Sequence, residues 1–116
     1  MEGRVKLTLA TAVSLAALVV FPTVASAQDT AHGAKVYADQ KCSVCHAIGG
    51  KGNAKGALDD VGSKLSAAEI HEWIVDPAAA TAKAKATRKP PMPAKYKTLP
   101  KADVDALVAY LASLKK

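Results

Sequence analysis

The sequence predicts an all-α fold in which three or more short helices are joined by long loops. Apolar residues recur at helical spacing in parts of the chain, whereas Val and Ile are too sparse to alternate with polar residues as strands require. The 116 residues fit a single domain, with few large side chains to fill a core. Domains of this kind often need a disulfide, a metal or a cofactor at the centre.

The N-terminus has the pattern of a secretory signal peptide. Basic residues precede an uncharged apolar run over residues 7–21, which is followed by the small-residue triplet Ala25-Ser26-Ala27. The run is shorter than the roughly 20 apolar residues that cross a bilayer, which disfavours a retained membrane anchor. We therefore predict a signal peptide over residues 1–27, cleaved after Ala27, and one exported domain over residues 28–116.

Three segments of the exported domain are predicted to be helices. The first covers residues 30–41 and is rich in alanine. The second, over residues 66–76, starts with the capping box Ser66-Ala67-Ala68-Glu69 and ends before Pro77. The third, over residues 100–114, starts with a proline and carries one apolar stripe. The stripe consists of Val104, Leu107, Val108, Leu111 and Leu114.

Two long loops, over residues 47–65 and 77–99, separate these helices. The first contains five glycines and the second contains four prolines. Loops of this length are uncommon in so small a domain unless they have a function. A central group that both loops wrap would explain them, and we expect no more than one extra helical turn, over residues 78–86.

The sequence Cys42-Ser43-Val44-Cys45-His46 carries the chemistry. A CxxC pair alone fits a redox dithiol, half of a zinc site or a haem attachment site. A thioredoxin-like dithiol would lie beside a βαβ pattern, which is absent here, and zinc would need a fourth ligand such as His32, His71 or a carboxylate. Behind an export signal, CxxCH favours one covalent haem c. Its vinyl groups would bind Cys42 and Cys45, and His46 would ligate the iron.

Met92 is the candidate ligand for the other face of the iron. It is the only methionine after the leader and lies in Pro90-Pro91-Met92-Pro93, where prolines restrict the backbone and hold the thioether in place. The alternatives are a methionine packed in the core, an iron with an open sixth position, and ligation by His71. His32 precedes the motif too closely to reach the opposite face.

Together these features resemble a monohaem class I c-type cytochrome over essentially all of residues 28–116. Gly33–Tyr37 is similar to the first helix of the cytochrome c family, and Leu107–Leu111 is similar to its C-terminal helix. In the family these helices cross, and the glycine lets them approach closely beside an aromatic pair. The resemblance implies that Tyr37 and Tyr110 form this pair here.

One position departs from the family pattern. Members usually carry Gly-Pro-x-Leu after the haem motif, and the proline carbonyl accepts a hydrogen bond from the proximal histidine. When the chain is aligned on Leu58, Gly56 stands where the proline would be. The acceptor is a backbone carbonyl, so Gly56 can still accept this bond from His46, which would tune the basicity of the ligand.

The resemblance implies a small cytochrome c fold around one haem and one-electron transfer between redox proteins. Together with the predicted signal peptide, this favours a periplasmic carrier. Ligation by His46 and Met92 is associated with a raised potential. The sequence shows no paired carboxylates, activated nucleophile or phosphate-binding motif that would indicate an enzyme. The alternatives are a dedicated haem c subunit of a dehydrogenase or sulfur-oxidising complex, and a gas-binding haem protein with an open iron.

Positive charge is concentrated near Met92. Removal of Glu2, Arg4 and Lys6 with the leader changes the net charge from +6 to +5, while residues 77–102 alone carry seven basic residues and no acidic one. Export, and the absence of basic motifs interleaved with aromatic residues, argue against nucleic acid. We expect an acidic redox partner to dock beside Met92, with transient association with membrane respiratory complexes. The simpler interpretation is a solvated loop that lysines keep soluble.

Overall fold

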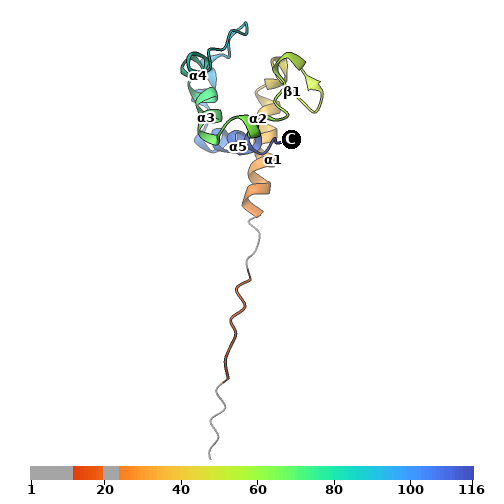
Figure 1. Ribbon diagram of the computed structural model, residues 1–116, viewed down its shortest axis with the longest axis vertical. Helices are drawn as coiled ribbons and strands as arrows, with labels where there is room; N and C mark the ends of the chain where they lie inside the picture. The colour runs from red at the N-terminus through yellow and green to blue at the C-terminus, as the bar shows by residue number, and fades with distance from the viewer. Residues whose placement is uncertain (1–11, 20–23) are drawn as a thin grey trace, which may run out of the picture.

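The computed structural model describes residues 12–19 and 24–116, and this part of the chain is mainly helical (Figure 1). Residues 12–19 are extended and their side chains are exposed. No helix within the described residues is long and apolar enough to span a bilayer. The remaining part of the expected leader includes residues 1–11 and 20–23, which lie outside the described residues, and cleavage after Ala27 stays a prediction.

Helix α1 (Val24–Asp39) and helix α5 (Lys101–Ala112) pack against each other and cross (Figure 1). Their backbones approach closely at Gly33 of α1 and Ala106 of α5. A Cβ atom on Gly33 would meet the Ala106 carbonyl oxygen and would lie 2.5 Å from the Cβ atom of Tyr110. Glycine therefore permits the close approach that the sequence predicted. The rings of Tyr37 and Tyr110 also form the expected pair, edge to face, with centroids 6.1 Å apart and planes at 68°.

The first helix begins earlier than the sequence predicted. It starts at Val24 rather than near residue 30, and it continues through Ala27. Residues 24–28 contain no glycine or proline that would stop a helix, so the pattern that marks a cleavage site is also compatible with helical backbone.

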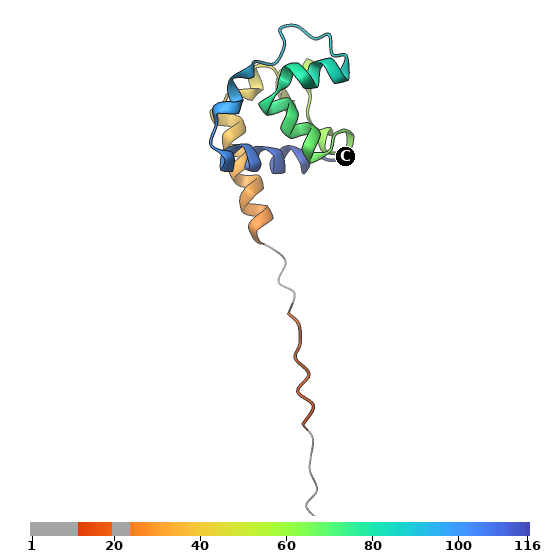
Figure 2. The same ribbon diagram turned by 90° about the vertical axis from the view of Figure 1, so that its left-hand side faces the viewer.

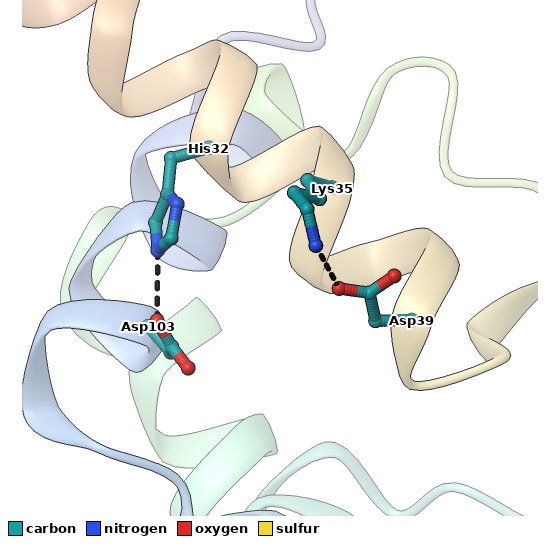
Figure 3. A network of polar contacts seen from close by, with 4 residues as sticks. All are labelled: His32, Lys35, Asp39 and Asp103. Atoms are coloured by element: carbon teal, nitrogen blue, oxygen red, sulfur yellow. Dashed lines mark hydrogen bonds and ion pairs between the residues drawn. The ribbon is translucent and has the colours of Figure 1, made fainter.

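Two polar contacts lie on α1, and one of them joins it to α5 (Figure 3). His32 Nε2 lies 2.7 Å from Asp103 Oδ1 on α5, and Lys35 Nζ lies 2.6 Å from Asp39 Oδ2 one turn further along α1. Both contacts are at the surface, where ion pairs contribute only about 0–1 kcal/mol. Close backbone packing at Gly33 therefore holds the crossing more than these pairs do.

Helix α3 (Ala67–Val75) begins at the predicted capping box. The Ser66 hydroxyl accepts a hydrogen bond from the Glu69 backbone N–H at 3.2 Å, and the Glu69 carboxylate accepts one from the Ser66 backbone N–H at 3.0 Å. Both backbone donors are thus satisfied at the exposed end of the helix. The predicted boundaries of this helix are confirmed to within one residue.

Helix α4 (Pro77–Ala84) and the 3-10 helix η3 (Ala94–Thr98) lie where the sequence predicted a loop. Pro77 occupies the first turn of α4, and the Asp76 carboxylate accepts a hydrogen bond from the Ala79 backbone N–H at 3.2 Å. These are strong start signals, and they outweigh the thin apolar face of the segment. Figure 2 shows α3, α4 and η3 in an arc that returns the chain to α5.

The glycine-rich segment 47–65 contains short elements where the sequence predicted a loop. Strands β1 (Ala47–Ile48) and β2 (Lys51–Gly52) pair antiparallel through a two-residue turn. The expectation that the chain has no strand was wrong because turn chemistry, not alternation, makes this hairpin. Gly49 and Gly50 have φ angles of 60° and 77°, which such a turn requires. The 3-10 helix η2 (Ala54–Gly56) and helix α2 (Val61–Lys64) follow.

The core is a small apolar cluster between α1, α3, η3 and α5. The stripe predicted on the last helix faces this cluster, since three of its five residues are buried in it. No polar or charged side chain is buried within the described part of the chain. The cluster consists of Val36, Ile70, Ile74, Tyr96, Val104, Leu107 and Leu111.

Replacement of Gly33 by alanine is expected to lower the free energy of unfolding by about 1–3 kcal/mol, because the methyl group overpacks the crossing. Helix propensity alone acts in the opposite direction, since alanine is favoured over glycine by about 1 kcal/mol. Chemical denaturation of the purified protein measures the change. The control is Ala38→Gly at an exposed position of α1, which should cost only that propensity. A Gly33→Ala protein more stable than the wild type would contradict the close crossing.

The capping box of α3 should make stability depend on pH. Hydrogen bonds, above all from the Ser66 backbone N–H, lower the pKa of Glu69 from its ordinary value of 4.5. Such a carboxylate stabilises the fold above its unfolded pKa, and the contribution is lost as the pH falls through the folded pKa. Denaturation of wild type and Glu69→Ala should therefore give a stability difference that shrinks below pH 4.5. A difference independent of pH would argue against the cap.

Candidate functional site

The Cys42–His46 motif forms one compact turn directly after α1. Lys41 has a left-handed backbone conformation, with φ 55° and ψ 39°, and turns the chain out of the helix into the 3-10 helix η1 (Cys42–Val44). The backbone N–H groups of Cys45 and His46 both donate to the Cys42 carbonyl oxygen, at 3.1 and 2.9 Å. Both cysteines are half-buried and have free thiols, and burial raises the pKa of Cys42.

A cavity of about 750 Å³ opens beside this turn. Its volume lies in the range of about 300–1,000 Å³ that is typical of sites for cofactors and small molecules. All four site residues predicted from the sequence line it, although one of them comes from the distant segment between α4 and η3. These four residues are Cys42, Cys45, His46 and Met92.

A second cavity of about 380 Å³ shares part of its wall with the first. His46, Trp73 and Met92 line both cavities. Trp73 is half-buried and belongs to both walls. The rest of the second wall is mainly apolar. Its apolar residues include Leu58, Val61, Leu65, Ile70, Ile74 and Leu111.

The imidazole of His46 is held by the backbone of η2. Its Nδ1 atom lies 2.9 Å from the Gly56 carbonyl oxygen, which confirms the contact that the sequence predicted. A carbonyl oxygen can only accept, so Nδ1 carries the proton and Nε2 keeps a lone pair for a metal. Burial is the largest influence on the pKa of His46 and lowers it, while the bond to Gly56 opposes this effect. A lowered pKa favours the neutral ring that ligation needs.

The two other histidines lie elsewhere. His71 is exposed and belongs to the lining of neither cavity, and His32 contacts Asp103 where α1 and α5 cross. Within the described ranges, no group of three or more His, Cys, Asp or Glu side chains is arranged so that it could hold a metal ion by itself. The structure thus brings neither alternative ligand to the wall that contains Cys42 and Cys45.

Two further residues contribute to the main cavity in ways that the sequence did not indicate. Tyr96 is buried and lines the cavity from η3, and burial raises its pKa. Arg88 lines it from the segment before Met92 and donates a hydrogen bond to the Cys45 carbonyl oxygen at 2.7 Å. Tyr96 is the only aromatic residue of the segment 77–99, which is a weak signal. No local pattern marks Arg88, which lies 43 residues from its partner.

The donor set fits a covalently bound haem. Two thiols in CxxC spacing, an imidazole with a free Nε2 atom and a thioether line one cavity, and an apolar wall adjoins it. Cysteine attachment with histidine and methionine ligation is a known arrangement of haem c.

The family model for cytochrome c matches residues 30–115. The chain therefore belongs to the cytochrome c family, and the all-α fold around a central cavity is that of a small cytochrome c. Neither the comparison with curated proteins nor that with solved structures gave a match. Family membership makes the chain a haem-binding electron carrier. Cys42 and Cys45 are its only cysteines, which is compatible with one attached haem c.

Proposed function

We propose that the protein is a periplasmic one-electron carrier and not an enzyme. In this proposal its haem c is bound through Cys42 and Cys45, and the iron is ligated by His46 and Met92. The observation that carries the proposal is that His46 and Met92, from distant chain segments, line the same two cavities. When it is bound, the haem supplies the one-electron couple.

The chain holds the two ligands by different means. The hydrogen bond to Gly56 orients the His46 ring and raises its basicity as a ligand. Met92 is flanked by prolines, whose fixed φ angles limit the positions that its thioether reaches. A thioether ligand raises the potential relative to a second imidazole, which suits a carrier that accepts electrons readily.

Three basic side chains belong to the lining of the main cavity. Lys41, Arg88 and Lys95 line it, whereas the single carboxylate in its lining, that of Asp39, is paired with Lys35. We define Lys41, Arg88 and Lys95 as the basic rim. It supports the proposal that an acidic surface of a redox partner docks here.

Not all seven basic residues of the segment 77–102 are free to attract a partner. Lys83 lies 2.6 Å from the Glu72 carboxylate on α3, which offsets its charge. Lys101 is paired in the same way with Asp105. The effective positive field is therefore centred nearer the cavity than the sequence alone indicates.

Replacement of Met92 by alanine tests the proposed ligation. We expect the haem to stay attached, because attachment depends on the cysteines. The weak far-red band of methionine-ligated ferric haem should disappear, the potential should fall, and the reduced protein should bind CO rapidly. Optical spectroscopy and redox titration measure these changes.

The matched control is His71→Ala, which should leave the spectrum and potential unchanged because His71 is exposed and lies outside both cavities. A spectrum that changes in the His71 variant and not in the Met92 variant would identify His71 as the ligand. A wild-type protein that already binds CO rapidly would indicate an open iron.

Charge reversal tests the docking surface. The double variant Lys95→Glu/Lys97→Glu should slow electron transfer to an acidic acceptor, because charge steering raises encounter rates by about 10–1,000-fold. Stopped-flow kinetics at increasing ionic strength measure the effect. The difference from wild type should become small as salt shortens the Debye length to about 8 Å.

The control for this experiment is Lys51→Glu/Lys55→Glu, which makes the same change in net charge on the exposed segment around β2 and η2. Lys35 would be a less suitable control position, because reversing its charge would also break its ion pair with Asp39. Equal slowing by both double variants would mean that net charge alone matters and that the surface at Lys95 and Lys97 is not a docking site.

A further inference from the structure

Arg88 connects the two sides of the main cavity. It lies between α4 and Met92, in the segment that carries the proposed distal ligand. Its side chain crosses to the haem-attachment turn, where Nη2 donates a hydrogen bond to the Cys45 carbonyl oxygen at 2.7 Å. Cys45 directly precedes His46, so the contact reaches the backbone that carries the proximal ligand.

The same guanidinium group packs on Gly56. A Cβ atom at Gly56 would lie 3.0 Å from Arg88 Cζ and would also collide with Arg88 Nη1 and the Cys45 carbonyl oxygen. The glycine, the guanidinium and the carbonyl group are therefore packed with no room for a methyl group between them. Gly56 has an ordinary negative φ angle, so this crowding, and not a special backbone conformation, is what requires glycine.

Of the two residues that Arg88 contacts, one accepts the hydrogen bond from His46 and the other directly precedes His46 in the chain. Gly56 accepts the hydrogen bond from His46 Nδ1 at 2.9 Å, and Cys45 is the chain neighbour of the donor residue. A planar guanidinium can donate to one group while its face packs on another, which the compact ammonium group of lysine does not reproduce. Its charge also strengthens the bond to the carbonyl oxygen.

We propose that Arg88 is a positioning residue that fixes the hydrogen bond between His46 and Gly56 and couples it to the segment of Met92. This inference rests on the proposed function, because it assumes that His46 is the proximal ligand. Arg88 acts through the imidazole and does not itself carry the electron.

The test is the exchange rate of the His46 Nδ1 proton with solvent, measured by NMR on the reduced, haem-loaded protein. Arg88→Ala should exchange this proton about tenfold faster than wild type or more, as expected for the loss of one charge-assisted hydrogen bond. The matched control is Lys89→Ala, which removes the same charge from the next exposed residue and should exchange at the wild-type rate.

Arg88→Lys separates geometry from charge. It keeps the positive charge but lacks the planar group, so exchange should remain fast while the redox potential stays closer to wild type than in Arg88→Ala. If Arg88→Ala does not load haem, Arg88→Gln serves for the same measurement, since it keeps a shorter neutral donor.

Wild-type exchange in Arg88→Ala would overturn the inference, as would equal acceleration in Lys89→Ala or full restoration by Arg88→Lys. These outcomes are distinct from failure of the proposed function, which is judged from the far-red band of the wild type and its loss in Met92→Ala. A wild-type protein that shows the band, together with unchanged exchange in Arg88→Ala, rejects the role of Arg88 alone.

Discussion

The close crossing of α1 and α5 at Gly33 is the constraint on which the rest of the structure depends. Helix α1 ends at Asp39, shortly before the turn that carries the two cysteines, so its contact with α5 sets where the attachment site lies. Helix α5 also supplies Leu107 and Leu111 to the core against which α3 packs. The packing of α1 against α5 therefore determines the position of the haem-attachment turn and also that of the apolar wall.

Side chains do not fill the centre of the domain, which leaves space for a bound group. Its buried cluster is small, and two cavities adjoin it that share His46, Trp73 and Met92 in their linings. A group that binds the folded chain and not the unfolded one stabilises the fold. The hydrogen bond to Gly56 fixes the His46 ring, and the prolines beside Met92 restrict the backbone there.

The helices with strong local signals could be predicted, and the structure confirms the capping box at Ser66 and the apolar stripe of the last helix. The sequence also predicted that the four site residues belong to one site. The CxxCH spacing and the single methionine after residue 27 can both be read directly from the sequence. The hairpin at Gly49 and the full length of α4 were missed because turns and caps, not periodicity, create them. Tertiary packing brings Arg88 to the Cys45 carbonyl oxygen, 43 residues away in the chain. The residues next to Arg88 in the sequence do not indicate this contact.

The most direct test of the account is the optical spectrum of the purified wild-type protein in both oxidation states, together with its pyridine haemochrome. The account predicts one covalent haem c per chain, a sharp α-band after reduction and a weak far-red band after oxidation that marks ligation by Met92. A haemochrome without covalent haem would contradict the central claim. An oxidised spectrum that lacks the far-red band would contradict the proposed pairing of His46 with Met92.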